Sequence, residues 1–369
     1  MRGCFNNIYE GKRVFLTGHT GFKGAWLSLF LKKLGAEVLG YSLEPSTEQS
    51  LFEVCEIKKE INSVIGDIRD LQYLTNAMSE FKPDIIFHLA AQPLVRASYR
   101  EPKMTYETNV IGTLNVYEAA RNCKTVKSIV TITTDKCYEN KEWAYGYREC
   151  DPMGGYDPYS SSKGCVELLT ASYRNSFLND LGINIATARA GNVIGGGDWA
   201  EDRLIPDFVR ATAEGELLLI RNPLATRPWQ FVLEPLSGYL WLGALLLEGK
   251  SKYACGWNFG PNDTDILSVE EILNLAINSW GRGSYAIDKS VQPHEANLLK
   301  LDISNAKTIL KWKPVYNVKK AVSKTMEWYK NYYENYLEVK DIDIKQLTLN
   351  QIDEYILEAK SKEILWGIK

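Results

Sequence analysis

Short runs of β-branched and other apolar residues alternate with longer amphipathic segments over the first 190 residues of the chain. Apolar runs of this length are typical of buried strands, and the segments between them are long enough for helices. Strands that alternate with helices form βαβ units, so we expect an α/β fold with a doubly wound parallel sheet covered on both faces. The predicted strands are Arg13–Thr17, Glu37–Tyr41, Ser63–Ile65, Asp84–Leu89, Ser128–Thr133 and Asn184–Ala188.

The pattern changes after Gly191, where a glycine-rich turn at residues 195–197 is followed by shorter elements. We predict a charged helix over Ile205–Glu214, a short strand over Trp229–Val232 and a helix over Pro235–Leu247, which together indicate a smaller α+β lobe. Residues 1–190 are therefore expected to form the doubly wound domain, and residues 191–330 mainly the smaller lobe, with some chain returning to the first domain. Residues 331–369 carry many Tyr, Lys and Glu at helical spacing, which predicts a helical extension packed on the body or on a partner subunit.

Composition and charge exclude several classes of protein. A net charge of −3 gives no overall basic field, so we expect no nucleic-acid partner. No apolar run approaches the roughly 20 residues of a membrane span, and the first residues lack the apolar core of a signal peptide, so we expect a cytoplasmic protein that spans no membrane. Seven scattered cysteines indicate reduced thiols rather than a disulfide framework, and three distant histidines argue against a metal site.

A glycine-rich loop follows the first predicted strand directly and opens the amphipathic segment Ala25–Leu34. Its glycines permit a tight turn, close approach of the backbone to a pyrophosphate, and close packing of the helix on the strand. The helix N-terminus adds free N–H groups and the positive end of the helix dipole. Because the loop lies between a strand and a helix, it predicts a Rossmann dinucleotide site. The residues expected to contact the cofactor there are Gly18, His19, Gly21, Phe22, Lys23 and Gly24.

The remaining cofactor contacts are expected at the ends of the next strands. The second strand runs to Ser42 and no acid follows until Glu44, so the expected contact with the ribose hydroxyls is weakened and we expect NAD to be held less firmly than in relatives with an acid there. No arginine stands nearby to accept a 2′-phosphate, so NAD is preferred to NADP. Asp67 either accepts a hydrogen bond from the adenine amine or serves as a turn or helix-cap aspartate. Further residues expected beside the cofactor are Ile68, Leu89, Ala90, Ala91 and Gln92.

Tyr159 and Lys163 stand four residues apart, so on a helix they share one face. An ordinary tyrosine pKa is near 10, and action near pH 7 requires the phenolate to be stabilised by ~4 kcal/mol. We predict that the Lys163 ammonium and a nicotinamide cation supply this stabilisation. Thr134 ends the fifth strand and can share the substrate hydroxyl with Tyr159, and Asp135 and Lys136 follow as an ionisable pair at the mouth of the cleft. The alternatives are an exposed Tyr/Lys helix pair and a solvated Asp-Lys turn.

Several longer motifs carry a specific resemblance. Beyond the glycine-rich loop they are Thr134–Lys136, Tyr138–Asn140, Gly154–Tyr159, Arg189–Trp199, Asp202–Pro206, Arg227–Gln230 and Pro293–Ala296. Together they resemble the CDP-glucose 4,6-dehydratase family, in the sugar-nucleotide dehydratase group of the extended short-chain dehydrogenase/reductase superfamily. The resemblance extends from about residue 10 to residue 330. Phe231 departs from the family pattern, which has a histidine there, and we expect this change to alter the substrate pocket without touching the chemistry.

The resemblance implies an NAD-dependent hydro-lyase that converts CDP-D-glucose to CDP-4-dehydro-6-deoxy-D-glucose for deoxysugar and cell-surface polysaccharide biosynthesis. It implies Asp135 as the acid for the C6 hydroxyl and Lys136 as the base for the C5 proton. Asn109, in a predicted helix over Tyr106–Ala120, would support the active site, and the helices containing Asn109 and Tyr159 would form a homodimer or a dimer of dimers. The implied contacts to the nucleotide sugar are Asn192, Arg203, Leu204, Arg227, Trp229 and His294.

Other interpretations of these residues stay open at this point. Arg203 stands beside Glu201 and Asp202 and has a simple ion pair as its alternative, and a turn at Pro293 explains His294 almost as well as a ligand does. An NAD-dependent sugar-nucleotide epimerase shares every step up to the 4-ketone, but it needs no acid and base at residues 135 and 136. A catalytically silent NAD-binding protein would have no use for the catalytic side chains.

Overall fold

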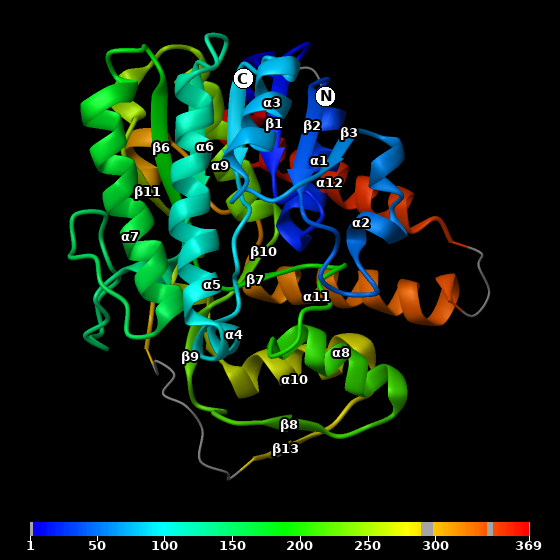
Figure 1. Ribbon diagram of the computed structural model, residues 1–369. Helices are drawn as coiled ribbons and strands as arrows, with labels where there is room; N and C mark the ends of the chain where they lie inside the picture. The colour runs from blue at the N-terminus through cyan, green and yellow to red at the C-terminus, as the bar shows by residue number, and fades with distance from the viewer. Residues whose placement is uncertain (1–2, 289–297, 338–341, 369) are drawn as a thin grey trace.

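The computed structural model describes residues 3–288, 298–337 and 342–368 and is built around one parallel sheet (Figure 1). The strands of this sheet are β1 (Arg13–Thr17), β2 (Glu37–Ser42), β3 (Asn62–Ile65), β4 (Ile85–His88), β5 (Ser128–Ile132), β6 (Asn184–Ala190) and β11 (Gly256–Phe259). Their order is β3–β2–β1–β4–β5–β6–β11, and every neighbouring pair is parallel. The α/β fold with a doubly wound parallel sheet is therefore confirmed.

The strand order reverses between β1 and β4, because the chain first builds outward from β1 through β2 to β3 and then crosses to the other side. Ligands of doubly wound sheets bind at such a reversal, outside the carboxyl ends of the strands. The loops that follow β1, β4 and β5 therefore converge on one edge of the sheet. All six strands predicted over the first 190 residues are present, with ends that differ by at most two residues.

β11 was not predicted from the sequence. It is a four-residue strand that pairs with β6 from Gly256 to Phe259, far along the chain from the other strands. A run this short carries little periodicity, so its pairing depends on the edge that β6 offers rather than on its own pattern. Its presence means that the segment after residue 191 returns to the main sheet.

Successive side chains of each strand point to opposite faces of the sheet, and each face is covered by its own helices. Val14 and Leu16 belong to the larger hydrophobic cluster, together with helices α1 (Phe22–Lys33) and α9 (Leu233–Leu247). Phe15 points the other way, into a cluster with α3 (Leu71–Phe81) and α6 (Gly112–Arg121). Helix α9 was predicted to begin at Pro235, and nearly all of it is buried because it packs against β5 and β6.

The remaining elements form the smaller lobe and the connections. In Figure 1, helices α8 (Leu204–Glu214) and α10 (Val269–Trp280) and the paired strands β8 (Leu218–Ile220) and β13 (Tyr285–Ile287) lie together at the bottom of the view, below the sheet. The other helices are α2 (Leu51–Val54), α4 (Val95–Arg100), α5 (Pro102–Tyr106), α7 (Pro158–Tyr173), α8 (Leu204–Glu214), α10 (Val269–Trp280), α11 (Val318–Lys330), α12 (Ile344–Ser361) and α13 (Leu365–Ile368). The short strands are β7 (Val193–Ile194), β8 (Leu218–Ile220), β9 (Thr226–Pro228), β10 (Gln230–Phe231), β12 (Ile266–Ser268) and β13 (Tyr285–Ile287).

The C-terminal helices α12 and α13 pack on the body of their own chain. The Trp366 ring stacks on Phe5 with centroids 4.9 Å apart, and the Tyr355 hydroxyl donates to the buried Glu234 carboxylate at 2.9 Å. Lys33 on α1 forms an ion pair with Asp353 at 2.6 Å. Across the described ranges, the search for a helix long and apolar enough to cross a membrane finds none.

Candidate active site

The three glycines of the loop after β1 have different structural roles. Gly18 has φ +77°, and a Cβ there would lie 2.7 Å from the Ala90 nitrogen. A Cβ on Gly24 would lie 2.0 Å from the Gly18 oxygen, so α1 could not pack on the loop. Over Gly21 the nearest atom to a Cβ is the Gly18 oxygen at 3.4 Å, an ordinary contact. The fold therefore requires glycine at 18 and 24, whereas Gly21 leaves open space at the N-terminus of α1, where a pyrophosphate is expected.

The His19 side chain does not face this space. Its ring is fully buried, with Nε2 2.7 Å from the Ser63 hydroxyl, and it packs edge-on against Phe52. A Cβ on Gly40 would lie 2.3 Å from the His19 ring, so β2 needs glycine there. Burial lowers the pKa of His19 to about 4, which keeps the imidazole neutral. The His19 side chain is therefore part of the core that the loop packs on, and only the backbone of His19 can contact a cofactor.

The predicted adenosine contacts lie at the ends of β2 and β3. Ser42 is buried, and its hydroxyl lies 2.9 Å from that of Thr20, which also donates to the Leu43 carbonyl at 2.8 Å. Asp67 accepts from the Arg69 backbone N–H at 2.8 Å and pairs with the Arg69 guanidinium at 2.6 Å, so its turn role is present. The hydrogen bonds from Arg69 hold the pKa of Asp67 below its usual range. Thr20 was not assigned a role from the sequence.

Asn109 ties the loop after β4 to the catalytic helix. Its side-chain oxygen accepts from the Gln92 backbone N–H at 2.8 Å, and its amide donates to the Gln92 carbonyl at 3.1 Å and to the Ser162 hydroxyl at 2.9 Å. The chain here is not the single helix predicted over Tyr106–Ala120. A π-helical turn, η3 (Glu107–Ile111), joins α5 to α6 and contains Asn109, which is buried. Such turns are frequent at functional sites because they redirect one side chain.

Helix α7 begins beside the cleft and carries Tyr159 and Lys163. The Asp157 carboxylate caps it by accepting from the Ser160 backbone N–H at 2.9 Å. Lys163 donates to the Ile132 carbonyl at 3.0 Å, and burial together with the charge of Lys23 lowers its pKa to about 7. The side chains of Tyr159 and Lys163 are both buried, so the alternative of an exposed helix pair is wrong.

The buried position of Tyr159 determines the pKa of its phenol. Burial raises it to about 12, and the lowering effect of a hydrogen bond with Thr134 is smaller. The protein's own groups therefore leave the phenol protonated at neutral pH.

Asp135 is a buried carboxyl with one oxygen unused. It is 2% exposed, its Oδ1 accepts from the Thr134 hydroxyl at 3.0 Å, and its Oδ2 has no hydrogen-bond partner among the described residues. A Cβ on Gly191 would lie 2.8 Å from Oδ2, so glycine is needed to make room for it. Burial raises the pKa of Asp135 more than Lys136 and Arg227 lower it. Since Asp135 is buried, the alternative of a solvated Asp-Lys turn is wrong.

A cleft of about 830 Å³ runs from these catalytic groups into the smaller lobe. Arg203 lines it and pairs with Asp198 at 2.7 Å, not with Glu201 or Asp202 as the simple ion-pair alternative supposed. His294 lies outside the described residues. The sequence predicts cofactor contacts, catalytic residues and substrate contacts, and several of these residues line the cleft. They are Phe22, Lys23, Thr134, Asp135, Lys136, Tyr159, Asn192, Arg203, Leu204, Arg227 and Trp229.

Phe231 is not part of the cleft. It is fully buried between Trp26 on α1 and Tyr316, with ring centroids 6.1 Å and 5.6 Å away. The expectation that this departure from the family pattern alters the substrate pocket is therefore wrong, because the side chain belongs to the core behind it. Within the described ranges, the structure also contains no cluster of three potential metal ligands.

The family model described as GDP-mannose 4,6 dehydratase matches residues 15–325. The chain belongs to that family. It is 51% identical over 330 residues to the CDP-glucose 4,6-dehydratase of Salmonella typhimurium strain LT2, which covers 88% of this chain and 92% of that protein. Two solved structures share the fold. A dTDP-glucose 4,6-dehydratase from Streptomyces venezuelae with NAD bound has a TM-score of 0.74 at 23% identity, covering 88% of this chain and 98% of that one. The UDP-glucose 4-epimerase of Thermotoga maritima has a TM-score of 0.75 at 21% identity, covering 88% of this chain and 100% of that one.

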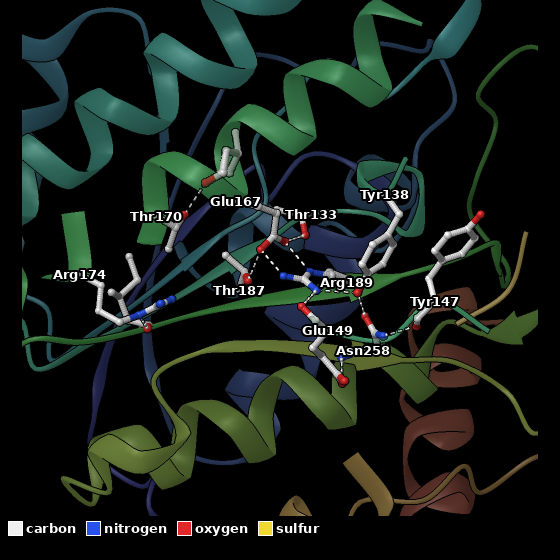
Figure 2. Close-up of polar contacts among 12 residues, drawn as sticks. Thr133, Tyr138, Tyr147, Glu149, Glu167, Thr170, Arg174, Thr187, Arg189 and Asn258 are labelled. Atoms are coloured by element: carbon white, nitrogen blue, oxygen red, sulfur yellow. Dashed lines mark hydrogen bonds and ion pairs between the residues drawn. The ribbon is translucent and has the colours of Figure 1, made fainter. Parts of the chain in front are cut away.

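A buried ion pair joins helix α7, which carries Tyr159 and Lys163, to strand β6 (Figure 2). Glu167 lies two turns after Tyr159 on α7 and pairs with Arg189 of β6 through Oε2 and Nη2 at 2.7 Å. The same carboxylate accepts from the hydroxyls of Thr133 and Thr187. Sequence reasoning missed this pair, although residues 159, 163 and 167 share one helix face and could have pointed to Glu167.

Proposed function

We propose that the protein is an NAD-dependent hydro-lyase that converts CDP-D-glucose to CDP-4-dehydro-6-deoxy-D-glucose. The observation that carries the proposal is the Asp135 carboxyl, which is buried at the cleft beside Thr134 and Tyr159 with a raised pKa and an unused oxygen. A proton donor at this position serves elimination of a hydroxyl, whereas epimerisation needs none there. The 51% identity to a CDP-glucose 4,6-dehydratase supports CDP-glucose as the substrate.

The loop after β1 fits the pyrophosphate of NAD, because Gly21 leaves space directly at the N-terminus of α1. Ser42 stands where many dinucleotide sites have a carboxylate, and it already bonds to Thr20. NAD is therefore held less firmly than in relatives with an acid at that position. A protein that keeps a full complement of NAD through extensive dialysis would contradict this.

The catalytic side chains divide the reaction between them. Tyr159 takes the proton of the C4 hydroxyl, with Thr134 hydrogen-bonding the same oxygen. Bound at the loop after β1, NAD would supply the acceptor for the C4 hydride and the donor of that hydride to C6, and its nicotinamide cation would stabilise the Tyr159 phenolate that burial alone disfavours. The ketone at C4 makes the C5 proton acidic. Lys136 removes that proton, Asp135 protonates the C6 hydroxyl as it leaves as water, and Lys136 returns the proton to C5 when C6 is reduced.

The test is to incubate the purified protein with NAD and with CDP-, dTDP-, GDP- and UDP-glucose, and to follow the 4-keto product of each. CDP-glucose should give the product fastest, without net accumulation of NADH, because the hydride taken from C4 is returned to C6. Stoichiometric NADH would contradict the dehydratase reaction. A C4-epimerised product, or a faster reaction with another nucleotide, would contradict the proposed reaction or substrate.

A substitution in the glycine-rich loop separates cofactor binding from folding. Gly21→Ala should weaken NAD binding by about tenfold, the equivalent of one lost hydrogen bond of about 1.4 kcal/mol, since the new methyl enters the space left for the pyrophosphate. Its thermal unfolding should stay close to wild type. Gly24→Ala is the contrasting variant and should lower Tm, because its Cβ would overlap the Gly18 carbonyl. Unchanged NAD affinity in Gly21→Ala, measured by calorimetric titration, would contradict this placement of the pyrophosphate.

We also propose a cytoplasmic homodimer formed by the helices that carry Asn109 and Tyr159. Helices α5, η3 and α7 pack against one another. Each carries one exposed large apolar side chain: Tyr106, Ile111 and Leu168. Adjacent exposed apolar groups on neighbouring helices are typical of a subunit interface. Light scattering should give the mass of a dimer at micromolar concentration, and Leu168→Lys should shift it toward the monomer. A wild-type mass of a monomer would overturn the proposal.

A further inference from the structure

Two arginines that received no role from the sequence meet in the substrate cleft. Arg96 on α4 and Arg221 just after β8 both line the cleft, although they are far apart along the chain. Both guanidiniums approach the same carboxylate oxygen, Oδ1 of Asp202, at 3.4 Å and 3.5 Å. Asp202 therefore holds positive groups from two distant segments of the chain at one point of the cleft.

These contacts are weak in comparison with the neighbouring ion pair. Arg203 and Asp198 are 2.7 Å apart, and the Asp198 side chain is 8% exposed. The Asp202 side chain is 34% exposed, and both of its ion pairs are longer than an ordinary hydrogen bond. Ion pairs of this exposure contribute little to stability. A ligand with more negative charge can therefore replace the Asp202 carboxylate, but it cannot easily replace Asp198.

Two further features indicate that a ligand binds where Arg96 and Arg221 contact Asp202. The Nη1 atom of Arg221 is buried and has no hydrogen-bond partner among the described residues, and an unsatisfied buried donor in a cleft calls for an acceptor. Asp202 itself has φ +60°, in the left-handed region that most non-glycine residues avoid. Backbone outliers of this kind concentrate at ligand sites, where the surrounding structure holds a side chain in a required position.

We propose that Arg96 and Arg221 bind the diphosphate of the nucleotide sugar, and that the diphosphate displaces the Asp202 carboxylate as it binds. A diphosphate carries two negative charges and several oxygens, so it can satisfy both guanidiniums at once, including Nη1 of Arg221. The inference rests on the proposed function, because it assumes a nucleotide-sugar substrate in this cleft. It gives Asp202 the role of a competitor built into the site and adds two arginines to the predicted Arg203 and Arg227.

The proposal predicts that substitution of Asp202 and substitution of its arginine partners change the affinity for CDP in opposite directions. Asp202→Asn removes the competing charge and should tighten binding of CDP by about three- to tenfold, because two weak ion pairs no longer have to be broken. Arg221→Gln and Arg96→Gln should each weaken CDP binding by about 10- to 100-fold, the range for a lost charge-assisted hydrogen bond. Calorimetric titration of CDP into the NAD-loaded protein measures all three. A purely structural carboxylate would instead weaken binding when removed.

Titrations with cytidine and with UDP show which part of the nucleotide the two arginines contact. If they bind the diphosphate, Arg221→Gln should weaken UDP and CDP by the same factor and leave cytidine unchanged. An effect confined to CDP, or shared by cytidine, would mean that the base is contacted and would overturn the proposal. Glu334→Gln is the matched control, since the Glu334 side chain is also 34% exposed, pairs with Arg282 at 3.9 Å and does not line the cleft. It should leave CDP binding unchanged.

The outcome stays separable from that of the proposed function. Turnover of the wild-type protein on the four nucleotide sugars identifies the substrate first. If another nucleotide sugar is preferred, CDP-glucose as the substrate fails, and the same titrations with that nucleoside diphosphate still test the arginines. Weaker nucleoside diphosphate binding in Asp202→Asn, with Glu334→Gln unchanged, would overturn the displacement of Asp202 whichever nucleotide is used.

Discussion

Asp135→Asn should produce a transient NADH absorbance that the wild-type protein does not accumulate. The substitution keeps the shape of the side chain and removes its acidic proton. Oxidation at C4 depends on Tyr159 and should continue, whereas loss of the C6 hydroxyl should slow by about 10²–10⁴-fold, the usual contribution of a general acid. Stopped-flow absorbance during a single turnover with CDP-glucose would measure both phases.

The structure gives this prediction its reason. Oδ2 of Asp135 has no hydrogen-bond partner among the described residues and can carry the acidic proton, whereas Oδ1 already accepts from Thr134. Tyr159→Phe is the matched variant and should stop hydride transfer itself, leaving the cofactor oxidised. If Asp135→Asn abolishes NADH formation as completely as Tyr159→Phe does, Asp135 serves oxidation or the fold, and this division of roles is wrong.

Glu167→Gln should lower the free energy of unfolding by about 3–5 kcal/mol, which is the effect of removing one partner from a buried ion pair. The Glu167 and Arg189 side chains are each 5% exposed, so the substitution leaves a buried guanidinium without its counter-charge. Arg189 also donates to the hydroxyl of Tyr138, which donates in turn to Asn258 on β11 at 2.7 Å (Figure 2). Urea unfolding, monitored by circular dichroism, measures the loss.

A double substitution distinguishes the ion pair from simple packing. Glu167→Leu combined with Arg189→Met removes both charges and should recover more than half of the stability lost by Glu167→Gln, because no buried charge is left unpaired. Thr187→Val removes one hydroxyl that donates to Glu167 at 2.7 Å and should cost only about 1 kcal/mol. A loss below 1 kcal/mol in Glu167→Gln would show that the pair contributes little to stability.

The sequence by itself determined the features that depend on nearby residues. The six strands, the glycine-rich loop and helix α7 are all marked by short-range patterns, because side-chain periodicity and capping act within a few residues. Tyr159 and Lys163 could be assigned to one helix face for the same reason. The loop could be placed at a cofactor site because parallel strands present their carboxyl ends at one edge.

Tertiary structure decided the features that join distant segments. β11 enters the sheet beside β6, Arg189 pairs with Glu167, and Asp202 pairs with Arg96, and none of these pairings has a local signature. The same is true of Phe231, whose position in the core depends on Trp26 and Tyr316. Burial is also a property of the whole fold, so the raised pKa values of Asp135 and Tyr159 follow from packing that no spacing of residues reveals.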